Sequence, residues 1–218
     1  MTQQSPAPSP RSGRDCAPPL VYVVDDDVSY LRSISRLLQA SGFEVVIHNS
    51  AAEFLSELRP EMTGCVITDL MMPGMNGIDL QEALCAADSS LPVIFLTGQG
   101  DIPTSVQAMR GGAEDFLTKN APKEDLFAAV NKALAHNAEE RARRARLDAL
   151  RRPFALLTDR EREVLRHVLQ GQLNKQIAAD LGIHERTVKL HRTNLTTKLG
   201  VHSVAELTRM VQEAGVTL

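Results

Sequence analysis

Short apolar runs alternate with amphipathic stretches between Leu20 and Ala121. The runs LVYVV, FEVVI, GCVITDL, PVIFL and AEDFLT are nearly all apolar, as expected of strands in a parallel sheet that is covered on both faces. The stretches between them place apolar residues three and four positions apart, which predicts helices. Five strands in βα alternation therefore predict an α/β domain built on a doubly wound (βα)5 parallel sheet.

After Pro122 the pattern is helical throughout. The segment EDLFAAVNKALAHNAEERARRARLDALRR predicts one long helix, with favourable i,i+4 pairs at Glu139–Arg143 and Glu140–Arg144. We expect Pro153 to end it, because proline lacks the N–H that a helix interior needs. A coiled-coil seam stays open as an alternative, although no sustained heptad runs through the basic stretch.

Capping signals divide the remaining chain into four short helices. Thr158-x-x-Glu161 and Ser203-x-x-Glu206 are capping boxes, and Asn174 is expected to cap another start. Gly171, Gly182 and Gly200 stand where helices should stop. The predicted organisation is a disordered leader at 1–18, an α/β domain at 19–135, a helical linker at 136–153 and an all-helical domain at 154–218.

Charge is distributed unevenly between the two halves. Residues 1–137 carry 9 Lys+Arg against 17 Asp+Glu, a net charge of −8, and residues 138–218 carry 15 against 10, a net charge of +5. An acidic half suits a cation and a basic half suits a polyanion, although ordinary solvated surfaces remain the plainer explanation. Three irregularly spaced cysteines, no apolar run of membrane-spanning length and no export signal predict a cytoplasmic protein without membrane contact.

Polar residues follow four of the predicted strands. Asp25 and Asp26 follow the first strand and Asp69 ends the third, so their carboxylates should share the sheet edge where ligands of such folds bind. Clustered carboxylates repel each other unless a cation neutralises them, and oxygen ligands suit Mg²⁺ (or Mn²⁺). Thr97 and Lys119 follow the fourth and fifth strands. With metal and ammonium neutralising charge, Asp69 is the best-placed nucleophile toward a phosphoryl group, which the Thr97 hydroxyl can then contact.

Through VVDDD, TDLMMPGMNG, FLTGQGD and DFLTKN, residues 19–135 resemble the receiver domain of two-component response regulators. The resemblance implies that Asp69 is the phospho-acceptor and that Lys119 pairs with the phosphate. It also implies a metal site of Asp25, Asp26, Asp69 and the Met71 backbone carbonyl, and a switch pair of Thr97 and Phe116. Plain core packing remains the alternative for Phe116. One departure is Asn120, where the family usually has a proline after the lysine, often through a cis peptide, so Lys119 is either displaced with a trans loop or held under strain.

The segment NKQIAADLGIHERTVKLHR has two helices joined by a glycine-containing turn, which is the helix-turn-helix pattern. With its flanks it resembles the DNA-binding domain of the LuxR/NarL/FixJ class. His184 departs from that class, which commonly has a capping serine there, so the second helix should begin less firmly. Base contacts are expected from Lys189, Leu190 and Thr193. Phosphate contacts at the groove edges are expected from Lys175, Arg186, Arg192 and Lys198, and Thr187 completes the predicted DNA surface.

Together these features predict a phosphorylation-dependent transcriptional regulator, not an enzyme beyond its own phosphotransfer and dephosphorylation. The implied partners are a sensor histidine kinase, double-stranded promoter DNA, RNA polymerase and, after phosphorylation, a second copy of the chain. A hydrolase that uses an aspartyl-phosphate is disfavoured, because no second acidic residue stands two positions after Asp69. A LuxR-type sensor of a small molecule is disfavoured too, since a chain without tryptophan is poorly suited to a buried lipophilic signal. A receiver that works unphosphorylated stays open as a hypothesis.

Overall fold

The structure, a computed structural model, describes residues 19–98 and 102–216. In its first unit five parallel strands form one sheet in the order β2-β1-β3-β4-β5. The strands are β1 (Leu20–Val24), β2 (Glu44–His48), β3 (Cys65–Thr68), β4 (Val93–Thr97) and β5 (Asp115–Thr118). The helices are α1 (Val28–Ala40), α2 (Ala51–Glu57), α3 (Gly77–Ala86), α4 (Ile102–Arg110) and α5 (Lys123–Ala155). The predicted doubly wound α/β architecture is confirmed.

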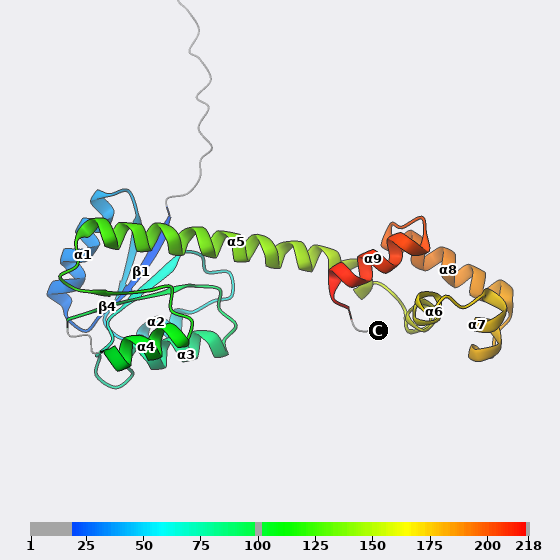
Figure 1. Cartoon of the computed structure of the whole chain (residues 1–218), viewed down its shortest axis with the longest axis horizontal. Coiled ribbons are helices and arrows are strands. Elements are labelled where there is room, and N and C mark those ends of the chain that lie inside the picture. Colours follow the sequence, from blue (N-terminus) through cyan, green and yellow to red (C-terminus); the bar gives the residue numbers. More distant parts are fainter. Residues whose placement is uncertain (1–18, 99–101, 217–218) are drawn as a thin grey trace, which may run out of the picture. The chain divides into compact units, whose positions relative to one another are not determined.

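Helices cover both faces of the sheet, with α1 and α5 on one face and α2, α3 and α4 on the other (Figure 1). Alternate residues of each strand enter different cores: Val21 and Val23 pack with α1 and α5, whereas Tyr22 packs on the opposite side. The strands are therefore apolar at successive positions, because both of their faces are removed from water.

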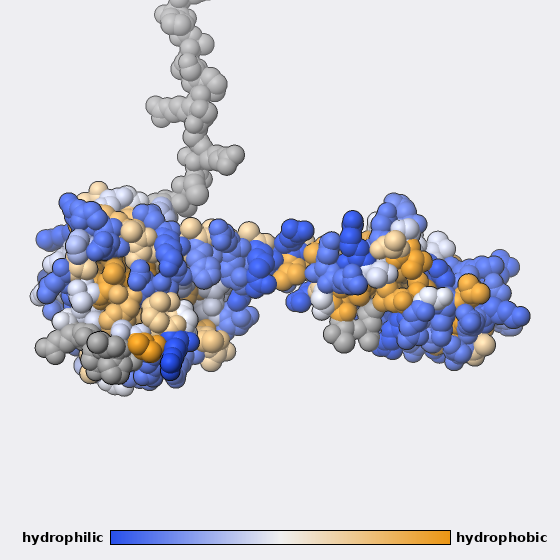
Figure 2. Space-filling model, in the orientation of Figure 1, coloured by the Kyte–Doolittle hydropathy of each residue, from blue (hydrophilic) through white to orange (hydrophobic). Residues whose placement is uncertain are grey.

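Helix α5 spans 33 residues, and the two compact units of the chain divide within it, between Ala138 and Glu139. The prediction that Pro153 ends the helix is wrong, since the helix continues to Ala155 and Phe154 is buried in the core of the second unit. The visible surface of this helix is largely hydrophilic (Figure 2).

Ion pairs stabilise the middle of α5, where Glu140 accepts hydrogen bonds from both Arg143 and Arg144. The predicted linker bounds remain a prediction, and the predicted leader at 1–18 lies outside the described residues.

The second unit is helical, as predicted, with α6 (Asp159–Leu169), α7 (Asn174–Leu181), α8 (Glu185–Leu199) and α9 (Val204–Ala214). The Thr158–Glu161 capping box is present, and Gly182 and Gly200 end α7 and α8 with left-handed φ angles of +65° and +66°. Asn174 does not cap α7, which corrects the expectation from sequence. Leu173 precedes the helix, and the Gln176 side chain accepts the hydrogen bond of its N–H.

No helix within residues 19–98 and 102–216 is long and apolar enough to cross a membrane.

Candidate functional site

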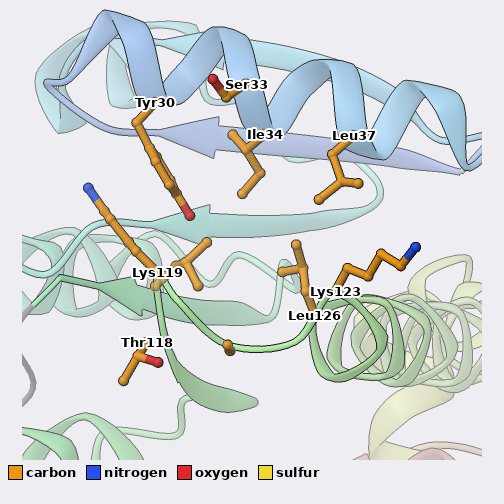
Figure 3. A pocket seen from close by; sticks show the side chains of 10 residues that line it. Tyr30, Ser33, Ile34, Leu37, Thr118, Lys119, Lys123 and Leu126 are labelled. Carbon is orange, nitrogen blue, oxygen red and sulfur yellow. The ribbon is translucent and has the colours of Figure 1, made fainter.

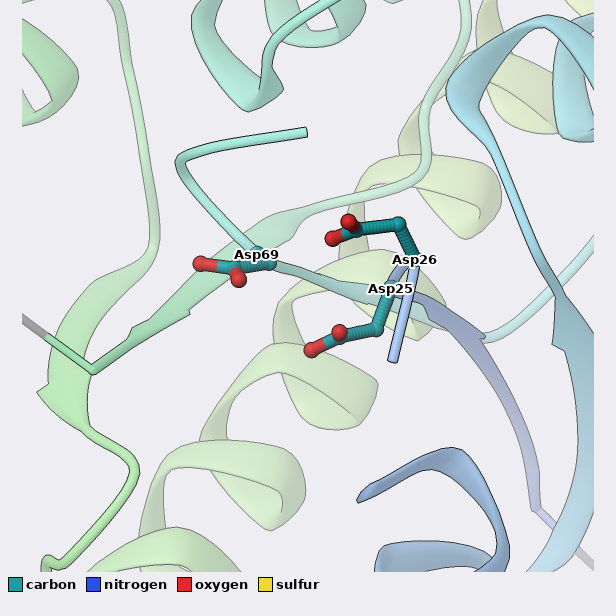
Figure 4. Close-up of side chains that lie close together, drawn as sticks. All are labelled: Asp25, Asp26 and Asp69. Carbon is teal, nitrogen blue, oxygen red and sulfur yellow. The ribbon is translucent and has the colours of Figure 1, made fainter. Parts of the chain in front are cut away.

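Three carboxylates meet where β1 and β3 end (Figure 4). The register pairs Val24 with Thr68, so the next residues, Asp25 and Asp69, are neighbours. One carboxylate oxygen each of Asp25, Asp26 and Asp69 lies within 4.8 Å of the others. Asp25 and Asp69 are buried and Asp26 is exposed, so the cluster opens to solvent on one side.

The backbone fixes the position of Asp69. Its N–H donates to the Val24 carbonyl at 2.9 Å, which extends the ladder between β1 and β3. Helix α3 begins close behind it at Gly77, where a Cβ atom would lie 2.4 Å from the Asp69 carbonyl oxygen and 2.9 Å from the Phe95 ring. Any larger residue at position 77 would therefore push the Asp69 backbone or the ring aside.

Lys119 reaches this cluster from the end of β5. Its Nζ lies 2.6 Å from Asp25 Oδ2 and 2.8 Å from Asp69 Oδ2. Its backbone N–H donates to the Thr97 carbonyl at 2.7 Å. Every peptide bond in the described ranges is trans, so the Lys119–Asn120 bond is trans, and the lysine still contacts both carboxylates without the usual proline.

Burial and ion pairing have opposite effects on the pKa values of Asp25 and Lys119. Burial raises the pKa of Asp25, although the hydrogen bonds from Lys119 and from the Asp27 N–H lower it. Burial would lower the pKa of Lys119, but its contacts with Asp25 and Asp69 outweigh this and raise it. Lys119 is therefore a cation at neutral pH, as phosphate pairing requires.

The remaining predicted receiver residues lie around the cluster. Thr97 is buried at the end of β4, next to β5 in the sheet. Phe116 is half-buried on β5, and its ring centroid is 6.0 Å from that of Phe95. Met71 is 71% exposed, and its backbone N–H is 3.4 Å from Asp69 Oδ1. Core packing and a switching role for Phe116 both remain compatible with this position.

Sequence reasoning missed two residues at this site. Asp27 caps α1, because its side chain accepts hydrogen bonds from the N–H groups of Ser29 and Tyr30. The Tyr30 ring lies under Lys119, with Nζ 4.4 Å from the ring centroid. An aspartate before a helix signals a cap, but the contact between positions 30 and 119 carries no signal in a single sequence.

A cavity of about 170 Å³ adjoins the cluster between α1 and the chain joining β5 to α5. Tyr30, Ile34 and Leu37 line it from α1, and Lys119 and Leu126 line it from the other side (Figure 3). Its wall is mainly apolar, with the Lys119 ammonium beside the tyrosine.

In the second unit, α7, the turn at Gly182 and α8 form the predicted helix-turn-helix. Val188, Leu195 and Leu199 bury one face of α8. Leu190 is 58% exposed, and Lys189, also exposed, lies 3.4 Å from Glu185. An open surface depression at the start of α8 is lined by His184, Glu185, Arg186, Thr187, Lys189, Leu190 and Thr193. His184 precedes the helix without a side-chain cap, as its residue type predicts.

Two of the predicted phosphate contacts are engaged within the protein. Arg192 donates to Asn174 Oδ1 at 2.9 Å, which joins α8 to the first turn of α7 and explains why Asn174 is no cap. Lys198 lies 2.7 Å from the buried Glu161 carboxylate and also donates to the Leu156 carbonyl. A guanidinium has donors to spare, but the Lys198 contacts favour a structural role over the predicted phosphate contact.

Comparison with known proteins gives the same two-part organisation. Residues 21–131 match the response regulator receiver domain family, and residues 155–211 match the LuxR family of bacterial regulatory proteins. The chain is 42% identical over 196 residues to the transcriptional regulatory protein FixJ of Azorhizobium caulinodans, covering 90% of this chain and 93% of FixJ. It is 40% identical over 193 residues to the response regulator protein TmoT of Ectopseudomonas mendocina, covering 88% of each. The structure of the response regulator StyR is similar with a TM-score of 0.78 and 46% identity, covering 90% of this chain and 100% of StyR.

The chain therefore belongs to the two-component response regulators that join a receiver domain to a LuxR-type DNA-binding domain. It is a transcriptional regulator and not a classical enzyme. Its receiver domain implies a histidine kinase as partner, and its LuxR-type domain implies DNA.

Proposed function

We propose that Asp69 accepts a phosphoryl group from the phosphohistidine of a sensor kinase and that this modification controls DNA binding by the second unit. The contact of Lys119 with both Asp25 and Asp69 carries the proposal. This contact places the Lys119 ammonium beside the Asp69 carboxylate, which follows β3. The Asp69 side chain is still 11% exposed, so a phosphodonor can reach it.

The transfer forms one bond and breaks one. An oxygen of Asp69 attacks phosphorus, the P–N bond to the imidazole breaks, and its electron pair stays on the ring nitrogen. Lys119 neutralises the phosphoryl oxygens as Asp69 loses its own charge, and the Thr97 hydroxyl contacts one of these oxygens after transfer. The same site hydrolyses the acyl phosphate when water attacks phosphorus: the P–O bond to Asp69 breaks, its electron pair stays on the carboxylate, and inorganic phosphate leaves.

The carboxylates of Asp25, Asp26 and Asp69 fit a Mg²⁺ or Mn²⁺ ion, because such ions use hard oxygen donors and one oxygen of each lies within 4.8 Å of the others. The Met71 carbonyl would be a further ligand. When bound, the ion neutralises phosphoryl charge. Lys119 alone supplies one positive charge against three carboxylates.

Mass measurement after incubation with phosphoramidate and Mg²⁺ tests this part. The wild-type chain should gain one phosphoryl group, and Asp69→Asn should gain none. Asp79→Asn is the matched control, since Asp79 caps the start of α3 outside the cluster. A phosphoryl group that survives Asp69→Asn would refute the assignment.

For the second unit we propose that α8 enters the major groove, with Lys189, Leu190 and Thr193 toward the bases. Lys175, Arg186, Thr187 and Arg192 would meet phosphates or groove edges. Leu190 is exposed on α8, so its side chain is available to contact a thymine methyl group. Lys189→Ala should relax base preference, whereas Arg192→Ala should mainly flatten the salt dependence of binding. The opposite pattern would reverse the two assignments.

Phosphorylation would act through Thr97 and Phe116 by favouring one receiver conformation, which dimerises so that two half-sites are read together and RNA polymerase is recruited. Light scattering and DNA titration, with and without phosphoramidate, test this step. Equal mass and equal affinity in both states would rule out the switch while leaving the phosphorylation site intact. The cytoplasmic location stays a prediction.

A further inference from the structure

The Lys119 ammonium has three neighbours of two kinds. The Asp25 and Asp69 carboxylates take two of its N–H donors, and the Tyr30 ring faces it at 4.4 Å from Nζ to the centroid (Figure 3). This distance is well within the range of about 6 Å over which an aromatic face attracts a cation. Only 17% of the Lys119 side chain is exposed, so the ring replaces water around the charge.

The position of Tyr30 depends on the acidic cluster itself. Asp25 Oδ1 accepts the Asp27 N–H at 2.9 Å, and the Asp27 side chain in turn accepts the Tyr30 N–H at 3.2 Å. The first turn of α1 is thus tied to the residues that follow β1. Tyr30 is held beside Lys119 by the same segment that supplies two of the three carboxylates.

We propose that Tyr30 is a positioning residue for phosphoryl transfer, which holds the Lys119 ammonium in the site while the lysine moves from Asp69 to the incoming phosphoryl group. This inference rests on the proposed function. Lys119 contacts Asp69 Oδ2 in the unphosphorylated site and pairs with the phosphoryl oxygens after transfer, so the ammonium must shift during the reaction. A ring face suits this movement, because its attraction for a cation requires no single bond direction.

Two further observations fit this role. Burial raises the pKa of Tyr30 to about 12, so the ring stays a neutral phenol and cannot bind Lys119 as a phenolate. The cavity of about 170 Å³ beside both side chains leaves space in which Lys119 can rearrange. The competing interpretation is that Tyr30 is only part of the apolar packing between α1 and the sheet, with which it is also in contact.

Substitution of the ring separates the two interpretations. Tyr30→Phe keeps the aromatic face and should keep the wild-type rate of phosphoryl uptake from phosphoramidate. Tyr30→Leu and Tyr30→Met keep apolar bulk without a ring, and each should slow uptake by about threefold to tenfold, the size expected for losing one partly desolvated cation–π contact. Leu37→Ala is the matched control, since it enlarges the same cavity from the same helix without the contact to Lys119, and it should leave the rate unchanged.

A spectroscopic measurement on the unphosphorylated full chain tests the contact independently. Protons on Lys119 Cε should show an upfield ring-current shift in NMR spectra of the wild type and of Tyr30→Phe, and this shift should vanish in Tyr30→Leu. Lys119→Met assigns the signal. Thermal unfolding of each variant identifies any that has lost its fold, and Tyr30→Met then replaces Tyr30→Leu.

The results that would contradict a positioning role for Tyr30 are the following. A lost ring-current shift with an unchanged rate, or a Tyr30→Phe protein as slow as Tyr30→Leu, overturns the positioning role. A rate that falls equally in Leu37→Ala assigns the effect to packing and overturns it too. Failure of the wild-type chain to gain any phosphoryl group would instead overturn the proposed function, while the ring-current shift would still report the contact.

Discussion

The buried ion pair between Glu161 and Lys198 should determine much of the stability of the DNA-binding unit. Glu161 has only 4% of its side chain exposed, and its Oε2 accepts from Lys198 Nζ at 2.7 Å and from the Thr158 N–H at 2.8 Å. One carboxylate therefore caps α6 and joins it to the end of α8. Glu161→Gln keeps the shape of the side chain and removes its charge.

The cost of this substitution follows from what remains behind. An unpaired charge deep in a protein costs several kcal/mol, but the Lys198 side chain is 34% exposed and water can solvate part of its charge. We therefore expect Glu161→Gln to lower the free energy of unfolding by about 1–2 kcal/mol, less than for a fully buried pair. The free energy of local opening around α6 and α8 should fall by the same amount.

The effect should depend on pH with a defined sign. Burial would raise the pKa of Glu161, but the hydrogen bonds from Lys198 and Thr158 outweigh it and hold the pKa below the ordinary value. A carboxyl with a lowered pKa stabilises the fold above its unfolded pKa, about 4.3, and loses that contribution as pH falls through the folded pKa. Calorimetric scans should thus separate wild type from Glu161→Gln at neutral pH, and the two should converge in acid.

Hydrogen exchange of the full chain, read by mass spectrometry, measures the change directly. Protection of α6 and α8 should fall about 5- to 30-fold in Glu161→Gln, and that of the receiver should not change. Glu163→Gln is the matched control, because Glu163 is on the same helix in an exposed pair with Arg160, and exposed pairs contribute little. Equal protection in the two variants would show that the Glu161 contact has no special stabilising role.

Three more outcomes follow from other contacts. Gly77→Ala should destabilise the receiver by about 1–3 kcal/mol in calorimetry, since its Cβ would meet the Asp69 carbonyl. Asn137→Ala should cost about 1–3 kcal/mol and loosen α5 in hydrogen exchange, because the buried Asn137 amide bonds the Gly64 N–H and the Ser90 carbonyl. Lys198→Met should leave the salt slope of DNA binding unchanged, whereas Lys175→Ala should reduce it by about 1; a reduced slope for Lys198→Met would return that lysine to the DNA contacts.

Much of the receiver could be predicted because its chemistry follows strand ends. Parallel strands deliver their carboxyl ends to one edge, so the predicted cluster of Asp25, Asp69 and Lys119 follows from strand boundaries alone. The capping box of Thr158 and the helix ends at Gly182 and Gly200 are likewise local signals that the structure bears out.

The errors concern residues whose local signal is overridden by a distant partner. Asparagine commonly caps helices. The Asn174 side chain instead accepts a hydrogen bond from Arg192, which is 18 residues further along the chain. Proline commonly ends a helix. Helix α5 nevertheless continues past Pro153, and Phe154 is thereby buried in the core of the second unit. Tyr30 lies on α1, and nothing in a single sequence shows that its ring meets Lys119.

Both units contain a buried carboxylate paired with a lysine. The number of carboxylates around each ammonium distinguishes the reactive pair of the receiver from the structural pair of the DNA-binding unit. Glu161 faces one ammonium, so that pair is neutral, and the Thr158 N–H donates a second hydrogen bond to the same carboxylate oxygen. In the receiver a cluster of three carboxylates has one ammonium beside it, Lys119, which contacts Asp25 and Asp69. That formal excess of two negative charges favours binding of a divalent cation, and a lysine shared between two acids can move to a third anion at low cost. The same kind of ion pair is therefore expected to stabilise the DNA-binding unit and to be exchanged during phosphoryl transfer in the receiver.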